Sequence, residues 1–193
     1  MTTHHDMGDP AAMAASATLH CLTGCAIGEI LGLVIGTAAG LDTAATIAVS
    51  ITLAFVFGYA LSSLPLLRSG LEVRRVLTIV LAADTLSILT MEVVDNLVVA
   101  AIPGAMNAGL VNVVFWVSMA LSLVAAFAAA YPVNRWLLRR GEGHALTHEF
   151  HGVEQRPEGW RRWIPAIGTT TLAVGIGAFI LGGAVVSLAE HLG

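Results

Sequence analysis

The stretch ATLHCLTGCAIGEILGLVIGTAAG, residues 17–40, decides the fold, because it is apolar enough to cross a membrane yet carries ligand-type side chains. On a helix, Cys21, Cys25 and Glu29 lie at steps of four and therefore share one face. His20 begins a neighbouring stripe that continues through glycines at the same spacing: Gly24, Gly28, Gly32 and Gly36. Small residues at this spacing let helices approach closely in lipid. We therefore expect the glycine face to pack against another helix, and it is also the surface through which a second copy or a partner membrane subunit would dock.

The composition indicates a membrane protein that contacts lipid. Of the 193 residues, 56% are hydrophobic and only 11% are charged, and the mean hydropathy is +0.82. All nine basic residues are arginine, so a lysine Schiff base with retinal or pyridoxal phosphate is excluded. The chain has no Walker loop and no dinucleotide fingerprint. We expect neither a bound nucleotide nor a nucleic-acid partner.

Five apolar segments predict an all-α integral membrane bundle, since a helix needs about 20 residues to cross the hydrocarbon layer. The expected spans are residues 15–37, 43–66, 76–101, 109–137 and 164–189. Pro65 is expected to close the second span and Pro132 to kink the end of the fourth. The corresponding organisation is a polar tail (1–14), a four-helix core (15–137), a loop rich in His and Arg (138–162), and a fifth helix with a short tail (163–193).

The arginines predict the orientation of the chain in the membrane. They lie between the second and third spans and between the fourth and fifth, whereas the other two connections have none. Basic loops face the cytoplasm, so we expect the N-terminus, tail 1–14 and loop 138–162 inside and the C-terminus outside. The expected location is the inner (cytoplasmic) membrane of a bacterium.

Two strings resemble a known family: HCLTGCAIGE at residues 20–29 and MEVVDN at residues 91–96. Together with the apolar pattern between them, they resemble a bacterial family of small polytopic membrane proteins known only as a domain of unknown function. The resemblance covers residues 14–137. It implies a helical membrane fold and brings no activity with it.

The third segment carries carboxyls that are costly in lipid, at about 2.5 kcal/mol or more each when charged and lipid-exposed. Asp84, Met91 and Asp95 share one helix face with Ser87, and Glu92 lies beside them. At a rise of about 1.5 Å per residue from the cytoplasmic end, Cys21 is expected level with Asp84, Cys25 with Ser87 and Ile88, and Glu29 with Met91 and Glu92. Four residues before and on the fourth segment are expected to complete the lining: Asn107, Asn112, Trp116 and Met119.

This set of side chains suits a transition metal ion, copper or zinc, as the bound cofactor or cargo. Thiolates and thioethers select Cu(I), whereas imidazole with carboxylate suits Zn(II). The expected ligands are His20, Cys21, Cys25, Glu29, Asp84, Met91, Glu92 and Asp95. A secondary cytoplasmic metal site is expected at His144, His148 and His151, whose spacing of four and three places them on one face of a helix.

The leading hypothesis is therefore a transporter, importer or insertion factor for copper or zinc, and not an enzyme. An alternative is a carrier coupled to protons or another cation, in which the carboxyls bind the ion and the cysteines are dispensable. A further alternative is a non-catalytic membrane assembly subunit. The cysteines also have a structural reading as small apolar core residues.

Overall fold

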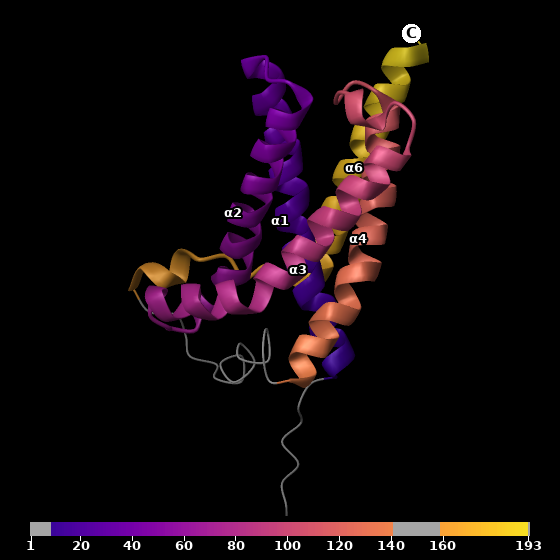
Figure 1. Cartoon of the computed structure of the whole chain (residues 1–193). Coiled ribbons are helices and arrows are strands. Elements are labelled where there is room, and N and C mark those ends of the chain that lie inside the picture. Colours follow the sequence, from indigo (N-terminus) through magenta and orange to yellow (C-terminus); the bar gives the residue numbers. More distant parts are fainter. Residues whose placement is uncertain (1–8, 141–158, 193) are drawn as a thin grey trace, which may run out of the picture.

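The computed structural model describes residues 9–140 and 159–192, and the elements within these ranges are all helices (Figure 1). Helix α1 (Pro10–Ala39) contains the whole stretch quoted above except its last residue. It begins where the Asp9 side chain accepts a hydrogen bond from the Ala11 N–H (3.0 Å), and Pro10 follows at the first helical position. It ends at Gly40, whose φ of 66° is the left-handed conformation that favours glycine.

Helix α2 (Thr43–Arg68) returns across the membrane along the glycine face of α1. A Cβ atom added at Gly24 would overlap the backbone of Gly58, and one added at Gly28 would overlap the backbone of Ala54. Gly32 and Gly36 face Ser50 and Thr46 in the same way. The glycine face of α1 therefore packs closely against α2 of the same chain. This is the face through which a second copy or a partner subunit was expected to dock.

Helix α3 (Val73–Ala101) is bent by 48° between its two parts, 73–82 and 84–101. Figure 1 shows the first part lying across the direction of α1, α2, α4 and α6, while the second part slants upward between them. The second part has 18 residues and so a length of about 27 Å, close to the hydrocarbon thickness. The expected span over 76–101 thus lies within α3, and the bend just before Asp84 is a feature that the sequence analysis did not predict.

Helix α4 (Val113–Arg139) begins four residues later than expected, after a short 3-10 helix, η1 (Ala105–Asn107). Asn112 marks the start, since its side chain accepts a hydrogen bond from the Val114 N–H (2.9 Å). α4 continues past Pro132 to Arg139, just as α2 continues past Pro65 to Arg68. Each proline removes one backbone hydrogen bond to the preceding turn without ending its helix, which is common in membrane helices.

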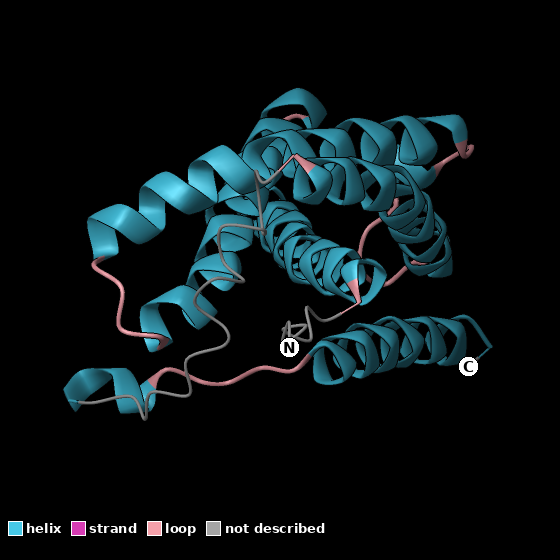
Figure 2. Cartoon of the chain, turned by 90° about the horizontal axis from the view of Figure 1, so that it is seen from below, coloured by secondary structure: helices cyan, strands magenta, loops and turns pink. Residues whose placement is uncertain are grey.

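The last segment consists of a 3-10 helix, η2 (Gly159–Trp163), an extended loop, and helix α6 (Thr169–Leu192). Figure 2 shows the loop running from η2 at one edge of the molecule to the start of α6, and it shows no strand in the described part of the chain. Trp160 and Trp163 of η2 are exposed next to Arg161 and Arg162, a combination that is typical of the membrane interface. The span begins five residues later than expected because Pro165 and Gly168 precede it.

The prediction of a helical membrane bundle is confirmed. Among the described helices, α1, α2, α4 and α6 are each long and apolar enough to cross a membrane, and the bent α3 makes five when its two parts are one span. All described arginines lie at the end of the bundle where α1 starts and α4 ends, which we call the arginine end: Arg68, Arg74, Arg75, Arg135, Arg139, Arg140, Arg161 and Arg162.

Candidate functional site

Three carboxyls from α1 and α3 lie together in the half of the bundle away from the arginine end. The Glu29 and Asp95 carboxyls are within hydrogen-bonding reach of each other, and Glu92 is their near neighbour. The Ser122 hydroxyl on α4 is within the same reach of Asp95. Glu92 is 3% exposed and Asp95 is 6% exposed, so both are sealed inside the protein. We call Glu29, Glu92 and Asp95 the carboxyl cluster.

The carboxyl cluster lines a cavity of about 380 Å³ that extends to the turns at the far end of the bundle, which we call the outer cavity. Helices α1 to α4 and the 3-10 helix η1 all contribute to its wall. Its other polar wall residues are Thr37, Thr43, Thr46, Ser50, Asn96, Asn107, Ser118 and Ser122. A cavity with this polar wall and acidic side chains at its deep end suits a cation.

The two cysteines lie deeper than the carboxyl cluster, towards the arginine end, and both are free thiols. The Cys21 Sγ is 3.7 Å from the Ser62 Oγ of α2, and Asp84 and Ser87 of α3 also lie close to this thiol. The Cys25 thiol lies beside the Glu92 carboxyl. Cys25 therefore connects the carboxyl cluster to the deeper polar residues.

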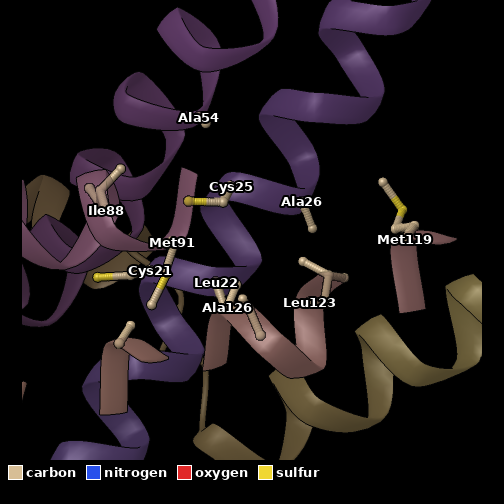
Figure 3. Close-up of a cluster of buried hydrophobic side chains, with 11 residues drawn as sticks. Cys21, Leu22, Cys25, Ala26, Ala54, Ile88, Met91, Met119, Leu123 and Ala126 are labelled. Atoms are coloured by element: carbon tan, nitrogen blue, oxygen red, sulfur yellow. The ribbon is translucent and has the colours of Figure 1, made fainter. Parts of the chain in front are cut away.

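Figure 3 shows how the sulfur atoms are arranged in the buried core. Cys21, Cys25 and Met91 lie in the same part of this cluster, whereas Met119 lies on the other side of Ala26, well away from both thiols. Met91 is 1% exposed and Met119 is 4% exposed. A soft-metal set in this arrangement would consist of the two thiols and the Met91 thioether.

The predicted faces of α1 and α3 do meet, but two of the three expected pairings are shifted. Cys21 lies near Asp84 as expected, whereas Cys25 lies beside Glu92 and Glu29 beside Asp95. The distance from Cys21 to Glu29 covers eight residues of α1, and the matching distance on α3, from Asp84 to Asp95, covers eleven. The physical reason is the slant of α3 in Figure 1, because a tilted helix uses more residues to rise through the same depth.

His20 is not brought together with the other expected metal ligands. Its Nδ1 is 2.8 Å from the Ser16 carbonyl oxygen, and its ring lines a second cavity at the arginine end. Within residues 9–140 and 159–192, no three His, Cys, Asp or Glu side chains are grouped so that they could hold a metal ion. His144, His148 and His151 lie outside the described residues.

Two of the residues expected to complete the lining have other roles. Met119 and Asn107 do line the outer cavity. The Trp116 Nε1–H instead donates to the Leu110 carbonyl (2.8 Å), and Asn112 caps α4. Indole N–H groups and asparagine side chains near a helix start are frequently used in this way, and sequence spacing alone does not distinguish these roles from lining.

The sequence analysis missed Ser62, Ser118 and Ser122, which line the two cavities. One signal points to Ser62: small residues recur every fourth position along the second segment, at Thr46, Ser50, Ala54, Gly58 and Ser62. This stripe matches the glycine stripe of α1 residue by residue. Had the two stripes been paired in antiparallel register, Ser62 would have been placed opposite His20, the residue before Cys21.

The fold and these buried carboxyls define a polytopic helical membrane protein with an acidic intramembrane cavity. The chain belongs to a family described as a domain of unknown function (DUF4396), whose model matches residues 12–143. The matched region runs from the third residue of α1 to beyond α4, so it includes all of the carboxyl cluster, and it ends before α6. Comparison with curated proteins and with solved structures finds no significant match.

Proposed function

We propose that this protein is a membrane carrier that binds a cation at the carboxyl cluster and passes it across the membrane. One observation carries the proposal: Glu29 Oε1, both Glu92 oxygens and Asp95 Oδ1 are buried and make no hydrogen bond of normal geometry with the described residues, although the Cys25 thiol lies beside Glu92. An unsatisfied polar group in a membrane interior costs several kcal/mol. A proton at these oxygens, or a cation that takes only one or two of the three carboxyls as ligands, removes that cost.

The bend of α3 supports transport over a purely structural role for the carboxyls. Interrupted helices are typical of ion and substrate sites in transporters, and α3 has a sharp bend where its membrane-spanning part begins. In this chain the break falls directly before Asp84, which is fully buried beside Cys21. Movement of one part of α3 against the other would change the surroundings of Asp84 and of the carboxyl cluster on the same helix.

The gathering of the described arginines at one end supports an orientation with that end in the cytoplasm of a bacterial cell. The outer cavity then lies towards the external side, with the carboxyl cluster buried at its deep end. In this orientation the carrier takes up its cation from outside, at the carboxyl cluster.

Flux through purified protein tests the proposal. The full chain is reconstituted in liposomes, and the dissipation of imposed gradients of H⁺, Na⁺ and divalent cations is followed with entrapped indicator dyes. We expect at least one gradient to dissipate faster than in protein-free liposomes. If the well-folded protein moves none of these cations, the proposal is wrong.

A second candidate, transport of copper or zinc, is favoured by the contact between Cys25 and Glu92, which joins soft and hard ligands. No three His, Cys, Asp or Glu side chains of the described residues are grouped so that they could bind a metal ion. This candidate therefore requires Met91 as a third copper ligand beside Cys21 and Cys25. Thiolate and thioether together select Cu(I).

Metal content separates this candidate from a carrier of protons. If copper is the cargo, we expect protein purified from copper-supplied cells under reducing conditions to retain near-stoichiometric copper by mass spectrometry. A Cys21→Ser, Cys25→Ser variant is expected to lose it, while Ser63→Ala, a matched change outside the cluster, retains it. Retention of copper by the double cysteine variant would contradict a site at these thiols.

A further inference from the structure

We infer that the cavity at the arginine end is the second mouth of the same pathway, and that the residues around Cys21 form the closed barrier between the two mouths. The inference rests on the proposed function, since it assigns a route to the cation that the carboxyl cluster binds. It concerns a cavity and residues of α2 that do not belong to the carboxyl cluster.

The second cavity, which we call the inner cavity, has a volume of about 410 Å³. It lies between the first turns of α1, the last turns of α2 and the loop before α6. Its polar wall residues are Ser16, His20, Ser62, Arg68 and Thr169. Among the described residues that line it there is no carboxyl group, so within this part of the chain it differs from the outer cavity in having only basic and neutral side chains.

Ser62 joins the inner cavity to the core. It is 4% exposed, it lines the cavity, and its Oγ lies 3.7 Å from the Cys21 Sγ. The path continues to Ser87 of α3, a fully buried residue close to the same thiol. The Ser87 Oγ makes no hydrogen bond of normal geometry with the described residues, and the Cys21 thiol is its close polar neighbour.

On the other side of Cys21, the path reaches the carboxyl cluster. Cys25 follows Cys21 by one helical turn and lies beside Glu92, which lines the outer cavity. Polar side chains thus continue from one cavity to the other: Ser62, Cys21, Ser87, Cys25 and Glu92. Each of these five side chains offers an oxygen or sulfur atom that can bind a cation.

The path is closed around Cys21 in this structure. Cys21, Ser87 and Ile88 are each 0% exposed, and Met91 is 1% exposed. Ile88 also packs against Gly58 of α2, where its Cδ1 would be 2.8 Å from an added Cβ. These residues separate the two cavities, so passage requires α2 and α3 to move apart at this level. The bend of α3 before Asp84 provides a joint next to them.

Two neighbouring serines give a matched test of the inner mouth. Ser62 and Ser63 are buried to the same degree, but Ser62 lines the inner cavity whereas the Ser63 Oγ donates to the Tyr59 carbonyl (2.6 Å). Each is changed to Cys in the full-length Cys21→Ser, Cys25→Ser background. A membrane-impermeant cationic methanethiosulfonate is then applied to one side of oriented vesicles at a time. Ser118→Cys in the same background probes the outer cavity.

We expect Ser62→Cys to react from the arginine end only, at least about tenfold faster than Ser63→Cys, because thiol reactivity follows accessibility. Ser118→Cys is expected to react only from the opposite side. The native Cys21 in a Cys25→Ser variant is expected to react slowly from both sides, as a barrier residue should. Equal rates for Ser62→Cys and Ser63→Cys, or reaction of Ser62→Cys from the outer side, would overturn the inference.

The labelling result does not depend on flux. If Ser62→Cys reacts as expected but the wild type moves no cation, the inner cavity is an aqueous recess and the proposed function fails. If the wild type moves a cation but Ser62→Cys is not labelled, the carrier stands and the route through Ser62 is wrong.

Discussion

Asp95→Asn is expected to abolish measurable cation flux. Asp95 lies at the centre of the carboxyl cluster, with Glu29 on one side and the Ser122 hydroxyl on the other. The amide has almost the same size as the carboxyl but carries no negative charge and cannot take up a proton. Breaking a buried charge interaction by removing one partner costs about 3–5 kcal/mol. Because 1.4 kcal/mol is about tenfold in affinity, we expect cation affinity to fall by at least about a hundredfold.

The measurement is the half-saturating cation concentration and the maximal rate of dye-reported flux in liposomes with equal amounts of folded protein. Glu72→Gln is the matched control, since Glu72 lies at the other end of α3, is exposed and makes no capping hydrogen bond. It should leave flux unchanged. Flux of Asp95→Asn equal to that of Glu72→Gln would show that the carboxyl cluster is not the binding site, even if the wild type is a carrier.

Helix faces could be predicted from the sequence because they depend only on the 3.6-residue period. This period placed Cys21, Cys25 and Glu29 on one face, and the structure shows that face turned towards α3 and its carboxyls. Apolar length predicted the helix number in the same way. The ends of α2 and α4 differed from expectation by only a few residues, where prolines are tolerated near helix termini.

Depth and neighbours could not be predicted, because they depend on tilt and on which helices meet. The slant of α3 brings Asp95 within hydrogen-bonding reach of Glu29, and the expected neighbour Glu92 lies near both. The bend before Asp84 could not be predicted, because residues 73–84 contain no proline or glycine. Ser62 and Ser63 have identical side chains, yet one faces a cavity and the other bonds to its own helix. Only the packing of α2 on the glycine face decides between them.

Gly28→Leu is expected to separate α1 from α2 and to prevent the carboxyl cluster from forming. Even the first side-chain atom at this position would overlap the backbone of Ala54 and Leu53, and backbone cannot rotate away as a side chain can. Overpacking a well-packed core costs about 1–3 kcal/mol, and sometimes more, when the neighbours are side chains. We expect the free-energy cost of a clash with backbone atoms to lie at the upper end of that range or above it. Glu29, the next residue, would be displaced with α1.

Thermal unfolding in detergent, followed by size-exclusion chromatography of the full-length protein, measures this effect. Gly182→Leu is the matched control, because a Cβ at Gly182 of α6 meets nothing within 4 Å and leucine is compatible with lipid. We expect Gly182→Leu to remain as stable as the wild type and to retain flux, and Gly28→Leu to lose both. If the two variants are equally stable, then α1 and α2 do not make the close contact that positions Glu29 beside Asp95, and the geometry of the carboxyl cluster would have to be built by other contacts.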